Sequence, residues 1–144
     1  MTAAILPLYS RLMKTHPLDK LYRVPRADAI DKLNRGLPAS VFPDLAARLA
    51  ISTRTLARAL GLSERTLRNR TRKLTGDEAE RSFRVYRVFR RAIEVFGDED
   101  QARAWLTTPQ PALGEREPLD LLVRDVGEDE VLSVLAAVED GGYL

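Results

Sequence analysis

The sequence has no cysteine and a single histidine, so it lacks residues on which several classes of catalytic and metal site depend. Without cysteine there can be no disulfide, zinc knuckle or thiol nucleophile, which favours a reducing, cytoplasmic compartment. The one histidine, His16, has no cluster of acids or hydroxyls around it, and we interpret it as a surface residue rather than a catalytic base. No glycine-rich phosphate loop or metal-ligand spacing occurs. We therefore expect no enzyme activity, no cofactor and no metal.

Long apolar runs are also absent, since nothing approaches the roughly 18 residues that a membrane span needs. The first residues lack a basic stretch followed by an apolar run, so we expect no secretory signal and no membrane partner. With 144 residues, of which 44% are hydrophobic and 31% charged, the chain can nevertheless bury a substantial core.

Charge is divided sharply along the chain at Gly97. Residues 1–97 contain 20 lysines and arginines against nine acids, a net charge of +11, whereas residues 98–144 contain three against 12, a net charge of −9. The basic part should attract polyanions and the acidic part should be repelled by them. We therefore expect two separate folded halves, the first suited to nucleic acid and the second to a protein.

The hydrophobic pattern predicts an all-α fold, in which a helix-turn-helix module is joined by a long helix to a small helical domain. We expect a partly ordered N-terminal segment with one short helix in residues 1–37. The helix-turn-helix module is predicted in residues 38–76, the connecting helix in 77–97 and the C-terminal domain in 98–144.

Two short helices around a tight corner are predicted in residues 52–74. Leu56 and Leu60 give the first helix a buried stripe, and Gly61 permits a left-handed turn after it. Ser63 is placed to cap the second helix. This arrangement is typical of a helix-turn-helix.

The second helix of this corner carries a positively charged face. A step of 100° per residue places Leu67 and Leu74 on one side and several basic and amide side chains on the other. Arginine and asparagine suit bidentate contacts with guanine and adenine, and residues 54–73 hold seven basic residues against the single acid Glu64. The alternative is a charged outer face of a helical bundle. On the first interpretation, the residues expected to contact DNA are Ser63, Arg65, Arg68, Asn69, Arg72 and Lys73.

A long helix should follow, because Thr75 and Glu78 form a capping-box pattern and Gly97 can end the helix. Its wide apolar arc needs covering by neighbours, which fits a helix that joins the two parts of the chain. The other face could extend the phosphate-contacting surface or simply face solvent, and it carries Arg81, Arg84, Arg87 and Arg91.

Capping signals predict three further helices in the acidic part. Asp98 is a good N-cap, and Pro118 is typical of a first helical residue. We expect Gly127 to separate that turn from a last helix, which Gly141 and Gly142 end.

Four motifs follow one another in this region: Phe96-Gly97, Ala102-x-x-Trp105-Leu106, Pro109-x-x-Ala-Leu-Gly114 and Pro118-Leu-Asp-Leu-Leu122. In this order they resemble the C-terminal toxin-binding domain of the MbcA/ParS/Xre antitoxins. The preceding Ser63-Glu-Arg-Thr-Leu67 looks like the Xre-type helix-turn-helix of the same family. One fragment alone would be weak, but the ordered run is specific. The resemblance covers roughly residues 35–144.

This resemblance implies an antitoxin encoded beside a RES-type toxin, which consumes NAD or transfers its ADP-ribose. The antitoxin would cover the toxin's NAD pocket with its acidic domain and repress its own operon through the helix-turn-helix. Family members often have Asp-Thr where this chain has Val123-Arg124, which bears on the choice of toxin rather than on the fold. By position, the domain core matches Trp105, Leu113, Leu119 and Leu122, and the toxin-contacting tail matches Gly141, Tyr143 and Leu144. We also expect Glu139 to contact the toxin.

The partners expected on this basis are a RES-type toxin and operator DNA. A helix-turn-helix reader usually dimerises to reach two half-sites, so we also expect a homodimer and a toxin–antitoxin hetero-oligomer. The alternative function is a stand-alone transcription regulator whose C-terminal helices dimerise or sense a small molecule.

Overall fold

The computed structural model describes residues 16–67 and 72–142. Those residues form helices and no strands, apart from two isolated backbone bridges, so the predicted all-α fold is confirmed. The elements are α2 (Pro17–Arg23), α3 (Arg26–Arg35), α4 (Val41–Arg48), α5 (Thr53–Ala59), α6 (Glu64–Leu67), α7 (Gly76–Phe96), α8 (Glu99–Leu106), the 3-10 turn η1 (Pro111–Leu113), α9 (Pro118–Leu121) and α10 (Asp125–Glu139).

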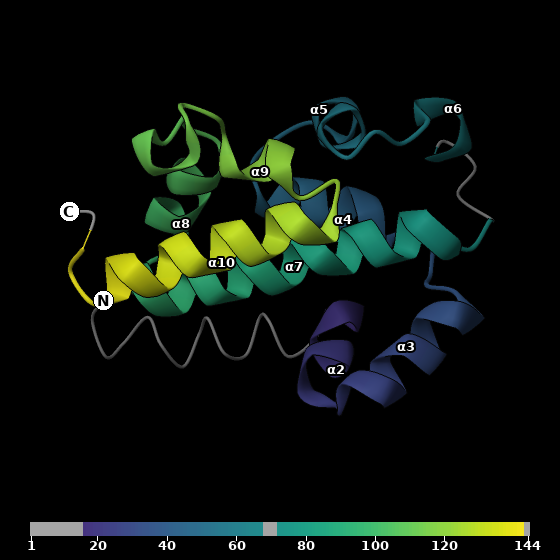
Figure 1. The fold of residues 1–144 in the computed structure, drawn as a ribbon. Helices are drawn as coiled ribbons and strands as arrows, with labels where there is room; N and C mark the ends of the chain where they lie inside the picture. The colour runs from purple at the N-terminus through teal and green to yellow at the C-terminus, as the bar shows by residue number, and fades with distance from the viewer. Residues whose placement is uncertain (1–15, 68–71, 143–144) are drawn as a thin grey trace.

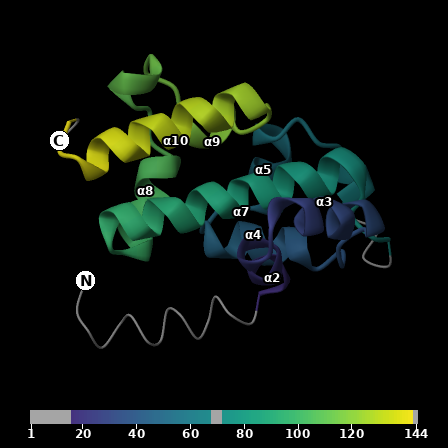
Figure 2. The ribbon, with the colours of Figure 1, turned by 60° about the horizontal axis from the view of Figure 1, so that its bottom comes forward.

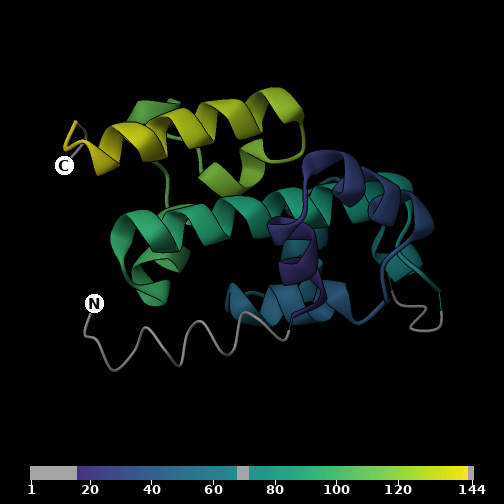
Figure 3. The ribbon, with the colours of Figure 1, turned by 90° about the horizontal axis from the view of Figure 1, so that it is seen from below.

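Helix α7 is the centre of the arrangement. Helix α10 lies beside it and runs in the same direction (Figure 1). Helices α2 and α3 cross α7 on a second side (Figure 2), and α4 packs against a third (Figure 3). The predicted short helix of the N-terminal segment, expected near residues 27–35 with its end at Gly36, is α3, whereas the short α2, which contributes the fully buried Leu18, was not predicted.

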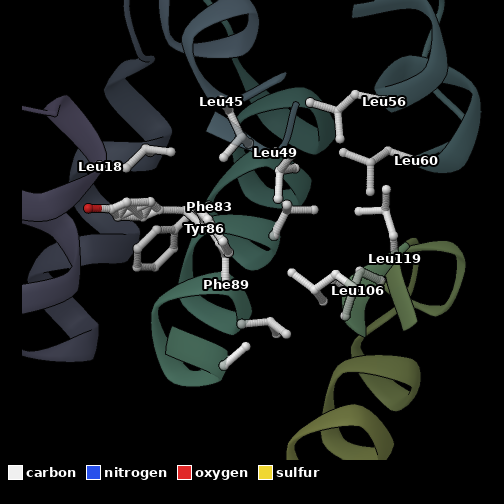
Figure 4. Close-up of a cluster of buried hydrophobic side chains, with 14 of the residues drawn as sticks. Leu18, Leu45, Leu49, Leu56, Leu60, Phe83, Tyr86, Phe89, Leu106 and Leu119 are labelled. Atoms are coloured by element: carbon white, nitrogen blue, oxygen red, sulfur yellow. The ribbon is translucent and has the colours of Figure 1, made fainter. Parts of the chain in front are cut away.

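One hydrophobic core runs through both parts of the chain. Side chains from α2, α4, α5, α7, α8 and α9 meet around the middle of α7 (Figure 4). Tyr86 and Phe89 of α7 are fully buried, as are Leu56 of the helix-turn-helix and Leu106 of the acidic part. The expectation of two separate folded halves is therefore wrong, because the acidic helices complete the core of the basic ones.

Local capping chemistry sets most helix ends. The Asp98 carboxylate accepts hydrogen bonds from the first amides of α8, as predicted. Gly97 ends α7 in the left-handed conformation, with φ of 72°. The predicted capping box at the start of α7 does not form, because Thr75 makes no side-chain cap and the Glu78 carboxylate pairs with Arg72 instead.

Gly127 has a different role from the one predicted. It is the third residue of α10, not a break before it, and it is buried. A Cβ atom at this position would lie 1.7 Å from the carbonyl oxygen of Leu121. Glycine is needed here because the end of α9 approaches the backbone of α10 directly.

Candidate nucleic-acid and partner surfaces

The helix-turn-helix corner between α5 and α6 is built by local hydrogen bonds. The Ser52 hydroxyl caps α5 by accepting the Thr55 amide at 3.0 Å. Gly61 turns the chain at φ of 63°, and the Leu62 amide donates to the Ala57 carbonyl at 2.8 Å. This Schellman-type end directs the chain into α6, whose first turn lies at the surface.

The structure locates four of the six predicted DNA-contacting residues. Ser63, Arg65 and Lys73 are exposed, and Arg65 makes no ion pair with any residue in the described ranges. Arg72 is half-buried and paired with Glu78 of α7. The other two predicted residues, Arg68 and Asn69, lie outside the described residues.

The prediction that the second helix continues to Leu74 is wrong at its end. Arg72 lies in a bend, and Leu74 has extended backbone. The amide and carbonyl of Leu74 pair with the carbonyl and amide of Leu37, each at 2.8 Å. Arg72 is therefore not on the helix, and its guanidinium cannot share a helical face with Arg65.

Two of the four arginines predicted on the polar face of α7 hold the ends of neighbouring helices. Arg84 is only 4% exposed, and its guanidinium donates to the Leu122 carbonyl at the end of α9 at 2.9 Å. Arg81 donates in the same way to the Leu60 carbonyl at the end of α5, at 2.8 Å. These side chains satisfy carbonyls that a helix end leaves unpaired.

Two α7 arginines also pair with acids of α10, one of them buried. Glu128 is 5% exposed and forms ion pairs with Arg84, at 3.3 Å, and with Arg87. Asp125 forms a further pair with Arg84. We call these four residues the α7–α10 ion-pair cluster. Because of this cluster, part of the negative charge of the acidic part neutralises the protein's own arginines.

An exposed pair links the far ends of the same helices. Arg91 makes two hydrogen bonds to the Glu139 carboxylate, at 2.9 and 3.0 Å. These bonds hold the pKa of the Glu139 carboxyl below its usual value. Asp129, Glu130 and Asp140 are exposed and form no ion pair with the described residues. The outer face of α10 and its C-terminus therefore remain acidic.

His16 is buried, so the interpretation of a surface residue is wrong. It is 4% exposed, and its ring stacks on Tyr86 with centroids 5.1 Å apart. Its Nδ1 accepts the Leu18 amide at 3.2 Å and so caps α2. Only the position of His16 immediately before Pro17 could have indicated this role, because proline is typical of the first residue of a helix.

Residues 16–67 and 72–142 hold no cluster of metal ligands and no membrane-spanning helix. No three His, Asp or Glu side chains there are grouped so that they could hold a metal ion. No helix there is long and apolar enough to cross a membrane.

Comparison with known families gives a match for each part of the chain. Residues 28–87 match the Antitoxin Xre-like helix-turn-helix domain, and residues 91–141 match the Antitoxin Xre/MbcA/ParS C-terminal toxin-binding domain. Antitoxin Xre from Yersinia enterocolitica is 33% identical over 118 residues, which cover 79% of this chain and 80% of the relative. This chain belongs to the Xre family of antitoxins. The resemblance read from the sequence motifs is thus confirmed.

Two further relatives carry related names. Antitoxin Xre from Photorhabdus laumondii is 30% identical over 121 residues, with 81% of this chain and 80% of the relative covered. A protein from Sphingobium sp. strain YBL2, named Prs ADP-ribosylating antitoxin, is 27% identical over 135 residues, with 85% of each chain covered.

In this Xre-family antitoxin, α7 belongs to both matched regions, because one match ends and the next begins within it. Most residues that the resemblance places in the domain core are buried, namely Leu113, Leu119 and Leu122. Trp105 is partly buried against Phe96, with ring centroids 5.9 Å apart. Of the tail residues, Gly141 ends α10 at φ of 85°, while Tyr143 and Leu144 lie outside the described residues.

Sequence reasoning missed the acidic outer face of α10. Asp129 and Glu130 were not among the predicted partner-binding residues, although both are exposed and lie outside the buried stripe of Val131, Leu135 and Val138. The helical spacing of that buried stripe was the available signal.

Proposed function

We propose that this antitoxin neutralises a RES-type, NAD-consuming toxin by covering its active site with the acidic C-terminal part, and that it represses its own operon through the helix-turn-helix. The main support is the placement of two surfaces of opposite charge on one shared core. The helix-turn-helix end, with Arg65, and the C-terminus of α10, with Asp140, lie at opposite ends of the α7–α10 pair (Figure 1). One molecule can therefore contact two partners without either blocking the other.

On the DNA side, we propose contacts from the start of α6 and the segment that follows it. The exposure of Arg65 and Lys73 supports this proposal, because both cations are accessible to phosphate. Arg72 can contribute only if it leaves Glu78. The proposed DNA-contacting set remains Ser63, Arg65, Arg68, Asn69, Arg72 and Lys73.

On the toxin side, we propose contacts from the end of α10 and the tail. A nucleotide-binding toxin commonly presents basic groups to phosphates, and an acidic cap complements them. Glu139 can join this contact because its pair with Arg91 is exposed and exchangeable. The proposed toxin-contacting set is Glu139, Gly141, Tyr143 and Leu144.

We further propose that the antitoxin acts as a homodimer on its operator and as a hetero-oligomer with toxin. A single helix-turn-helix reads one half-site, and two copies related by a two-fold axis read a palindromic pair.

The toxin half of the proposal is tested by co-expressing the antitoxin with the neighbouring gene. We expect the two products to co-purify and the antitoxin to restore the growth that the neighbouring product alone suppresses. Co-purification without growth rescue would contradict neutralisation. A neighbouring product that neither binds the antitoxin nor consumes NAD would instead favour a stand-alone regulator.

A further inference from the structure

The helix-turn-helix corner occurs twice in succession, with α5 shared between the two copies. An offset of 11 residues aligns residues 45–56 with residues 56–67, and seven of the 12 aligned positions are identical. Both copies close with the same motif, Ser52-Thr-Arg-Thr-Leu56 in the first and Ser63-Glu-Arg-Thr-Leu67 in the second. The repeat makes Arg54 of α5 the counterpart of Arg65 of α6.

The backbone repeats as closely as the sequence does. Helix α4 ends at Ala50 in the left-handed conformation with φ of 56°, and α5 ends at Gly61 with φ of 63°. In each copy the next amide, from Ile51 or Leu62, donates to the carbonyl five residues earlier, at 3.1 and 2.8 Å. Both are Schellman ends. The α4–α5 and α5–α6 corners therefore have the same geometry.

Residues of both motifs also line one groove on the same face of the molecule. Thr53 of the first motif and Glu64 of the second line the same groove of about 460 Å³, together with the start of α4. The Arg54 guanidinium reaches across to the Glu64 carboxylate, with Nε 3.6 Å from Oε2. Arg54 thus lies at the edge of the surface that carries Arg65.

Arg54 is free to change partner. Its side chain is 70% exposed and that of Glu64 is 38% exposed. An exposed ion pair contributes little to stability, whereas a DNA phosphate offers arginine a charge-assisted, bidentate contact. The exchange of Glu64 for phosphate therefore costs little.

We propose that Arg54 is a DNA-backbone contact that pairs with phosphate beside the Arg65 site, so that α5 and α6 bind the duplex along one edge. This inference rests on the proposed DNA-binding function. A contact to the backbone fixes the position of the protein on the duplex and carries no base preference. It therefore predicts a loss of affinity without a loss of specificity.

The test measures binding of the full-length protein to two duplexes as a function of salt concentration. One duplex is the DNA directly upstream of the antitoxin gene, and the other is an unrelated duplex of equal length. We expect Arg54→Ala to weaken both by a similar factor and to reduce the slope of log K against log salt by about 0.9, the value for one phosphate. Arg54→Lys should keep the slope, because it keeps the charge.

The matched control is Arg116→Ala, which removes the same charge from an exposed position in the acidic part. We expect it to leave the slope unchanged. An Arg54→Ala protein that melts normally and keeps the wild-type slope would overturn this inference while leaving the proposed function intact. A wild-type protein without salt-dependent binding to either duplex would instead overturn the proposed DNA-binding function.

Discussion

At the scale of single residues, His16 shows how burial makes a histidine structural. Its pKa is lowered from 6.5 to about 4, chiefly by burial and then by the positive charge of Arg48. The nearby carboxylates of Asp44 and Asp19 oppose this shift only in part. The neutral ring is also required by geometry, because Nδ1 accepts the Leu18 amide and cannot do so when protonated.

This lowered pKa predicts that acid destabilises the fold. Between pH 6.5 and pH 4 the unfolded chain binds a proton at His16 that the folded chain does not, so the stabilisation present above pH 6.5 is lost as the pH falls. From pH 7 to pH 5 the loss is about 2 kcal/mol in the free energy of unfolding. Urea unfolding at the two pH values measures it.

The control is His16→Asn, because asparagine can cap α2 but does not titrate. Carboxylates elsewhere contribute equally to both proteins and cancel in the comparison. If the variant lost as much stability as the wild type between pH 7 and pH 5, His16 would not be the titrating group.

At the scale of secondary-structure elements, α7 and α10 are joined by pairs of two kinds. The α7–α10 ion-pair cluster has a buried centre, because only 5% of the Arg84 side chain and 7% of the Glu128 side chain are exposed. The Arg91–Glu139 pair is exposed to solvent. An arginine–carboxylate pair should therefore contribute more to the free energy of unfolding at the buried position than at the exposed one.

We expect Arg84→Ala to lower the free energy of unfolding by about 3 kcal/mol, because the buried Glu128 keeps only its pair with Arg87 among the described residues and the Leu122 carbonyl loses its donor. Arg91→Ala, which breaks a pair between the same two helices, should cost less than about 1 kcal/mol. Urea unfolding followed by the fluorescence of the single tryptophan, Trp105, measures both variants. Similar losses in the two would show that burial does not set the strength of these pairs. The double variant Arg84→Met, Glu128→Leu should regain most of the lost stability.

The elements that follow local rules were predictable from sequence. Gly36, Gly97 and Asp98 marked helix ends correctly, because left-handed turns and side-chain caps depend on neighbouring residues only. The end of the second helix-turn-helix helix was not predictable, since it depends on backbone pairing between Leu37 and Leu74. Contacts distant in sequence decided it.

In the candidate surfaces, too, local features could be predicted from the sequence and long-range contacts could not. Arg65 was identified from helical spacing, and it is exposed as that spacing requires. The burial of Arg84 could not be inferred, because its partners on α9 and α10 are about 40 residues away along the chain. The 11-residue repeat that identifies Arg54 was also missed, because Leu56 ends one copy and begins the next.

At the scale of the whole molecule, the charge division along the sequence becomes two surfaces on one core rather than two modules. The acids of α10 that face α7 neutralise its arginines, while those that face outward remain available. The helix-turn-helix keeps exposed cations at the far end of α7 (Figure 1). Because the two surfaces lie apart but share one core, we expect a single change to abolish both proposed activities only when it unfolds the protein.

Separation of the two activities tests this account most directly. Arg65→Ala and a chain truncated after Asp140 are each assayed for growth rescue against the co-expressed toxin and for binding to the upstream duplex, with the melting temperature measured as a check of folding. The account predicts that Arg65→Ala still rescues growth but binds DNA weakly, and that the truncated chain binds DNA but no longer rescues growth. Loss of both activities in either variant, with a normal melting temperature, would contradict it.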